Sequence, residues 1–267
     1  MAKLSLTPAL KKEYEQLFNN CLINPNRFND VKTLVKSLYD NRSLYQDVGD
    51  KMGIPWSFIA VVHNMESSQD FKRHLHNGDP LRAPTVHVPK GRPPGSGPFS
   101  WQTSAADALG LRKLSAKTDW TLSGTLYQLE LYNGIGYRLY HPHVLTPYLW
   151  SFSNHYQNGK YVGDGTWSES AKSAQCGAAV LLRRMAENGH IDFADQPSPA
   201  MGDAPIIVKY SASKPGSSEA VAKVQDLQRW LNTFPGIFVK VDGVPGDRTS
   251  AAYLKVTGHY LPGDPRG

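Results

Sequence analysis

The sequence has little cysteine, no long apolar run and no block of like charge, and each absence excludes a class of protein. Its two cysteines, Cys21 and Cys176, are too few for a disulfide framework in 267 residues. Both lie among apolar residues, which predicts buried free thiols. No apolar run approaches the ~20 residues that a membrane-spanning helix needs. We therefore expect a globular chain without stable membrane insertion.

The N-terminal segment and the net charge bear on where the chain is made and on what it binds. The opening MAKLSLTPALKKEYEQLF carries charges where a signal peptide has its apolar stretch, so we expect synthesis in the cytoplasm without a signal peptide. Lys and Arg number 29 against 23 Asp and Glu, giving a net charge of +6, which favours anionic partners. Because no basic cluster, zinc-finger spacing or RNA-binding signature accompanies this charge, we do not expect nucleic-acid binding.

What the sequence does have is helical periodicity. A Thr7–Pro8 pair predicts the start of a first helix, and Asn29 the cap of a second. Pro55 opens PWSFIAVVHNMESS, a helix so apolar that it should be buried, and this helix ends at Glu66. Further helices are predicted over 104–113, 121–132, 144–153 and 169–187.

Proline and glycine divide the rest of the chain. Residues 74–100 predict an irregular loop or short hairpin, in which PTVHV has the alternation of a strand. The stretch DFADQPSPAMGDAP is typical of a linker. We therefore predict a mainly α, α+β domain over 1–195, a linker over 196–206 and a small three-helix module over 207–267.

Glu66 is the most informative single residue. A carboxyl group at the C-terminal end of an apolar helix is disfavoured in its charged form by desolvation and by the negative end of the helix dipole. Its pKa should therefore rise. A carboxylic acid that stays protonated near neutral pH can protonate the leaving oxygen of a glycoside. The alternative is a solvated acid at a frayed helix end.

The segment after this helix carries a family resemblance. HNGDPLRAPTVHVP places Asp79 and Thr85 six positions apart, and this resembles phage-type lysozymes, in which a helix-end Glu is followed by a hairpin with Asp, five residues and Thr. The resemblance implies that Glu66 is the general acid and that Asp79 and Thr85 position water. The gap between Glu66 and Asp79 is longer than in that family, and VHVP replaces its glycine-rich stretch.

A second resemblance concerns the sugar cleft. MESSQ is similar to the Glu-Ser step of goose-type lysozymes and lytic transglycosylases, and ELYNGIGYR is similar to their cleft-lining segment. Tyr132, Asn133 and Gly134 fall on the matching positions, which implies contact with sugar. The Gly-Leu-Met-Gln element of those enzymes is replaced by PFSWQTSAADAL. Trp101 and Tyr137 add flat rings of the kind that pack on pyranose faces.

The C-terminal segments VQDLQRWLN, VDGVPGDRT and AAYLKVTG are similar to the short helical peptidoglycan-binding domain of wall hydrolases. Glycines there permit tight turns, and Asp242 can bind backbone N–H groups of the loop. Most of the motif therefore builds the fold, and Leu-Lys stands where the domain usually has Phe-Gln. The matching residues are Gln228, Asp242, Gly243, Gly246 and Thr249.

Together these resemblances imply a phage endolysin of the lysozyme-like superfamily, a muramidase that cleaves the β-1,4 bond between N-acetylmuramic acid and N-acetylglucosamine. Its partner is bacterial peptidoglycan, which it reaches from the cytoplasm after holin-type release. We expect a monomer that needs no metal or organic cofactor. A lytic transglycosylase with the same bond specificity is the alternative, and retaining and inverting chemistry both stay open.

Three other functions remain open at this point. His63, His74, His76 and His87 lie near Asp79 in the sequence and could form the zinc site of a peptidoglycan amidase or endopeptidase, although no HExxH motif is present. A chitinase or chitosanase would use the same Glu66 chemistry on another polysaccharide. A binding protein without catalysis would need only the C-terminal module.

Overall fold

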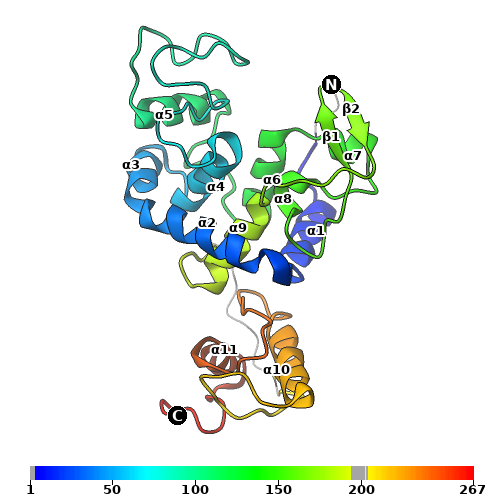
Figure 1. The fold of residues 1–267 in the computed structure, drawn as a ribbon. Coiled ribbons are helices and arrows are strands. Elements are labelled where there is room, and N and C mark those ends of the chain that lie inside the picture. The colour runs from blue at the N-terminus through cyan, green and yellow to red at the C-terminus, as the bar shows by residue number, and fades with distance from the viewer. Residues whose placement is uncertain (1–3, 194–201, 203) are drawn as a thin grey trace.

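A computed structural model describes residues 4–193, 202 and 204–267. Within these residues the fold is mainly helical, as predicted, with eleven α-helices and a single two-stranded sheet (Figure 1). The helices are α1 Pro8–Asn19, α2 Phe28–Asp40, α3 Arg42–Met52, α4 Trp56–Ser67, α5 Trp101–Leu111, α6 Leu122–Asn133, α7 Gly136–Tyr140, α8 Pro147–Trp150, α9 Ala178–Glu187, α10 Ser218–Leu231 and α11 Asp247–Thr257.

The first two helices start differently. The predicted cap of α1 is confirmed, because Thr7 Oγ1 accepts the backbone N–H of Leu10 at 3.2 Å. The predicted cap of α2 is wrong. A 3₁₀ turn, η1 (Pro25–Arg27), runs directly into α2 at Phe28, so Asn29 lies inside the helix.

Helix α4 forms the centre of the first part of the chain. It packs against α3, α6 and α9, and the side chains of Phe58, Ile59 and Val62 are fully buried. Each such side chain contributes roughly 1.5–3 kcal/mol relative to an exposed one. The predicted burial of this helix is confirmed, and its consequence is that Glu66 is held at the end of a rigid core element.

Of the two alternatives predicted for residues 74–100, the irregular loop is confirmed and the short hairpin is wrong. The segment forms an irregular loop beyond α5 with one isolated bridge, Arg73 to Pro80 (Figure 1). Its six prolines lack the N–H that a strand ladder needs. The antiparallel sheet instead pairs β1 (Lys160–Gly163) with β2 (Thr166–Ser168).

Two helices are also shorter than predicted. The helix expected over 169–187 begins only at Ala178, since SESAKSAQ offers no apolar face to bury. Of the helix expected over 144–153, only α8, Pro147–Trp150, is helical. Gly177, just before α9, lies so close to α8 that a Cβ on it would clash with the carbonyl oxygen of Leu149.

The C-terminal region has its own hydrophobic cluster, formed on α10, α11 and the segment between them. Leu227, Leu231, Val239 and Val256 are buried there. The prediction of three helices is wrong, because residues 232–246 form turns that side-chain hydrogen bonds hold in place. The predicted linker, 196–206, lies largely outside the described residues.

Two predictions from composition concern the cysteines and membrane-spanning helices. Cys21 and Cys176 are both buried and free, as predicted. Burial raises the pKa of the Cys21 thiol to about 12, so it stays a neutral apolar group. Among the described helices, none combines the length and apolarity needed to cross a membrane.

Candidate active site

Glu66 lies one residue before the end of α4, which stops where Ser68 adopts a left-handed backbone (φ 52°). The side chain is half-buried. Burial raises the pKa of Glu66 to about 7, while a hydrogen bond from Tyr148 and the charge of Arg112 oppose the rise. A substantial fraction of Glu66 is therefore protonated near neutral pH, in the direction that its place on the apolar helix predicts.

Two tyrosines and one arginine surround this carboxyl group. Tyr148, on α8, donates its hydroxyl to Glu66 Oε1 at 3.0 Å. Burial raises the pKa of Tyr132, and the charge of Glu66 adds to this effect. The Arg112 guanidinium lies 4.6 Å from the centre of the Tyr132 ring and donates to its carbonyl oxygen at 3.1 Å. Tyr148 and Arg112 were not predicted from the sequence.

A pocket of about 350 Å³ adjoins Glu66 through Tyr148. Asn133, Gly134 and Tyr137, three of the residues predicted to line a sugar cleft, line this pocket together with Tyr148. Gln175 forms another wall, and its amide donates to the carbonyl oxygens at the end of α4, 2.8 Å from that of residue 65. The structure thus brings the end of α6, α7, α8, β1 and the segment before α9 together around one pocket, and Tyr148 and Gln175 connect it to the end of α4.

Asp79 has an environment unlike that of Glu66. Its Oδ2 accepts the N–H groups of Val86 and His87 and the amide of Asn77, at 2.8, 3.0 and 3.1 Å, while Oδ1 accepts from the His87 ring at 2.6 Å. Burial pushes the pKa of Asp79 upward, but the His87 and Val86 hydrogen bonds outweigh it and lower the pKa to about 2. Asp79 is therefore an ionised group that holds its own loop together.

Thr85 also forms hydrogen bonds within the loop. Its Oγ1 donates to the carbonyl oxygen of Pro89 and accepts the N–H of Arg92 at 3.0 Å. The loop nevertheless contacts the end of α4, since a Cβ on Gly78 would lie 3.0 Å from the carbonyl oxygen of Glu66. The structure therefore brings the Asp79 loop to the main chain at the end of α4, with the polar atoms of Asp79 and Thr85 engaged within that loop.

The histidines near Asp79 are hydrogen-bonded: His87 bonds Asp79 itself, and His74 and His76 share Ser104. His63 is buried, hydrogen-bonds Tyr45 at 3.1 Å, and burial lowers its pKa to about 4. His76 pairs with Asp107 at 2.8 Å. Throughout the described part of the chain, no group of three or more His, Cys, Asp or Glu side chains could hold a metal ion. The ligand set suggested for a zinc amidase is therefore not assembled.

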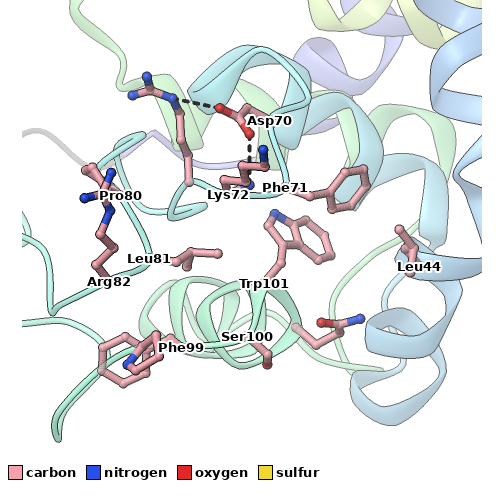
Figure 2. A pocket seen from close by; sticks show the side chains of 13 residues that line it. Leu44, Asp70, Phe71, Lys72, Pro80, Leu81, Arg82, Phe99, Ser100 and Trp101 are labelled. Atoms are coloured by element: carbon pink, nitrogen blue, oxygen red, sulfur yellow. Dashed lines mark hydrogen bonds and ion pairs between the residues drawn. The ribbon is translucent and has the colours of Figure 1, made fainter.

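Trp101 does not line the pocket beside Glu66. It lines a larger cavity of about 760 Å³ that shares no residue with the pocket beside Glu66. Figure 2 shows Trp101 among the residues that line that cavity, between Phe71 and Leu81. The ring of Trp101 packs against His63 and Phe71, with centroid distances of 4.8 and 4.9 Å. The structure therefore separates Trp101 from the other predicted sugar contacts.

In the C-terminal region, the matched motif surrounds the amide of Gln228, which is 1% exposed. Its Nε2 donates to Asp242 Oδ1 at 3.0 Å and to Thr249 Oγ1 at 3.1 Å. Its Oε1 accepts the N–H of Gly243, whose φ of 77° suits glycine, at 2.9 Å. Gly246 caps α11. All five matched residues thus take part in the turn itself.

Comparisons with known proteins identify no relative of this chain. No protein-family model matches the chain. Searches of curated proteins and of solved structures likewise give no match. The chemical interpretation therefore depends on the residues around Glu66.

Proposed function

We propose that this chain is a peptidoglycan glycosidase that cleaves the β-1,4 bond between N-acetylmuramic acid and N-acetylglucosamine, with Glu66 as the general acid. The observation that carries the proposal is the raised pKa of Glu66, about 7, beside a pocket lined by tyrosine and amide side chains. Such a carboxyl group still holds a proton near neutral pH and can transfer it to a glycosidic oxygen.

The hydrogen bond from Tyr148 fixes which oxygen acts. Since Oε1 of Glu66 accepts the Tyr148 hydroxyl, and Oε2 has no hydrogen-bond partner among the described residues, Oε2 is the oxygen that delivers the proton. As the bond between C1 of muramic acid and the leaving oxygen breaks, positive charge develops at C1. Tyr148 then stabilises the carboxylate that remains on Glu66.

The pocket suits an amino sugar. Its volume of about 350 Å³ lies at the lower end of the ~300–1,000 Å³ typical of ligand sites. Tyr137 offers a ring for the apolar face of a pyranose. Asn133 and Gln175 offer amide oxygens that can accept the hydroxyl and N-acetyl N–H groups of a sugar. These groups would hold one sugar beside Glu66.

The nucleophile is either water or the 6-hydroxyl of muramic acid. The polar groups that shift the pKa of Glu66 are Tyr148 and Arg112, and neither is an acid. Asp79 and Thr85 are engaged in their own loop. This favours a reaction in which Glu66 first gives its proton to the leaving oxygen and then takes the proton of the nucleophile. Attack by water yields a reducing muramic acid, and attack by the 6-hydroxyl yields the 1,6-anhydro sugar of a lytic transglycosylase.

Digestion of purified peptidoglycan by the wild type and Glu66→Gln, followed by mass spectrometry, tests the proposal. We expect new glycan ends, intact stem peptides and a loss of more than ~100-fold in rate in the variant, because Gln cannot donate the proton. An anhydro product is lighter than the hydrolysed one by one water, which separates the two outcomes. Clearing that Glu66→Gln retains, or cleaved peptide bonds, would refute the assignment.

A further inference from the structure

A third cavity lies where the C-terminal region meets the helices of the first part. Its volume is about 540 Å³. One wall is mainly apolar and consists of residues between α1 and α2, including Leu22 and Ile23, and of Phe28 at the start of α2. The facing wall consists of polar residues of the C-terminal region, including Lys214 and Gln225. Binding sites frequently occur at such junctions between domains.

The two walls are fixed to one another by packing. Phe238, from the segment between α10 and α11, lies edge-on against Phe18 and Phe193, with ring centroids 5.4 and 6.3 Å apart. Arg183, on α9, is fully buried and donates to the carbonyl oxygens of Phe18 at 3.0 Å and Val239 at 3.4 Å. An aromatic contact and a shared guanidinium therefore hold the cavity in one shape.

A second arginine also forms hydrogen bonds between the C-terminal region and the first part. Arg248, on α11, donates to the carbonyl oxygen of Glu187 at 2.7 Å and also to that of Asn188. These carbonyls lie at the C-terminal end of α9, where the helix dipole favours a cation. The cavity is therefore present before any ligand arrives, which lowers the entropy cost of binding.

The charge that reaches the cavity is positive. Lys214 has no ion-pair partner among the described residues, and Lys240 Nζ lies 3.6 Å from Asp242 Oδ2 and 3.6 Å from the Phe28 ring centre. Two acids line the cavity: Glu187 is paired with two arginines of α9, and Asp242 is the acid that Lys240 faces, so Lys214, Arg229 and Lys240 outnumber them by one charge. An anionic group that enters the cavity would therefore meet two lysines.

We propose that this junction cavity binds the acidic stem peptide of peptidoglycan. Lys214 and Lys240 would pair with its carboxylates, Gln225 would bond its amide groups, and the apolar wall at Leu22 and Ile23 would contact its methyl groups. The proposal rests on the proposed function and names how the C-terminal region takes part. It also gives that region a ligand contact that its Gln228 motif, engaged in the turn, does not supply.

Calorimetric titration of the full chain with the tetrapeptide L-Ala-γ-D-Glu-L-Lys-D-Ala tests the proposal. We expect saturable binding that Lys214→Ala/Lys240→Ala weakens about tenfold or more, since a charge-assisted hydrogen bond contributes ~1.5–3 kcal/mol. Amidation of the peptide carboxylates should weaken binding similarly. Lys223→Ala/Lys255→Ala is the matched control, because it removes the same charge from exposed positions outside the cavity.

Three outcomes would overturn the proposal: no binding by the wild type, equal loss in both double variants, or displacement of the peptide by an equal concentration of inorganic phosphate. Lys214→Ala alone provides a second variant if the double variant folds poorly. Glycan strands stripped of stem peptides separate this proposal from the proposed function. The wild type and the Lys214→Ala/Lys240→Ala variant should cleave them equally, whereas only failure of the wild type to cleave them counts against Glu66.

Discussion

The end of α4 and the loop that follows it each hold a carboxyl group, and the two groups behave in opposite ways. Glu66 is half-buried, accepts one hydrogen bond from Tyr148 and has a raised pKa of about 7. Asp79 accepts four hydrogen bonds and has a lowered pKa of about 2. The number of donors, more than burial itself, decides which group keeps its proton. One group is thereby suited to proton transfer and the other to structure.

The largest test of this comparison is the removal of the Asp79 carboxylate. Asp79→Ala leaves the N–H groups of Val86 and His87 without their acceptor, so we expect a loss of roughly 2–4 kcal/mol in the free energy of unfolding. Urea denaturation measures it. Asp70→Ala is the control, because Asp70 is an exposed acid paired with Arg73 and should cost less than ~1 kcal/mol. Equal costs would mean that Asp79 does not organise the loop.

A smaller effect should appear in the pH dependence of stability. Folding raises the pKa of Glu66 from 4.5 to about 7, so the folded chain keeps a proton that the unfolded chain releases between these values. The unfolding free energy therefore falls as pH rises from about 4.5 to 7. Glu66→Gln lacks this loss, and its stability relative to the wild type should be roughly 2 kcal/mol higher at pH 8 than at pH 4.

Asp79→Asn provides the contrast in the same thermal or chemical denaturation series. Folding lowers the pKa of Asp79 from 3.8 to about 2, so its stabilisation is present above pH 3.8 and is lost as pH falls toward 2. Its stability difference from the wild type should stay constant between pH 4 and 8. A difference that changes over this range as it does for Glu66→Gln would remove the distinction between the two acids.

The smallest expected effect concerns the hydrogen bond to Glu66. Tyr148→Phe removes a donor that lowers the pKa of Glu66, so this pKa should rise further and the alkaline limb of the activity profile should move to higher pH. The rate at the optimum should fall less than ~10-fold. Tyr127→Phe is the matched control, because its hydroxyl bonds the carbonyl oxygen of Leu4 instead. A downward shift, or the same shift in both variants, would contradict the role of Tyr148.

The sequence predicts the direction of the Glu66 pKa because that depends on a single apolar helix, which is a local property. It does not predict Tyr148, which lies 82 residues away and reaches Glu66 only when α8 packs into the core. The same holds for Gln175, 110 residues from the carbonyl group that it bonds. Contacts of this range leave no periodic pattern in the chain.

The errors in the fold have equally specific causes. Alternation in PTVHV is typical of a strand, yet the N–H groups of Val86 and His87 bond the Asp79 carboxylate and are not available to a neighbouring strand. In the C-terminal region, Gln228 donates and accepts five hydrogen bonds that hold the segment between α10 and α11 in turns, and the region has two helices where three were predicted. In both places, side-chain hydrogen bonds to the main chain determine the backbone conformation.

Phe238 has a consequence for engineering chimeric enzymes from this chain. Since its ring packs against Phe18 and Phe193, the C-terminal region is part of the hydrophobic core that it adjoins and is not an interchangeable cassette. A replacement module would need an aromatic residue in this position and a carbonyl group for the buried guanidinium of Arg183. Otherwise the exchange exposes an apolar surface and leaves Arg183 without one of its carbonyl acceptors.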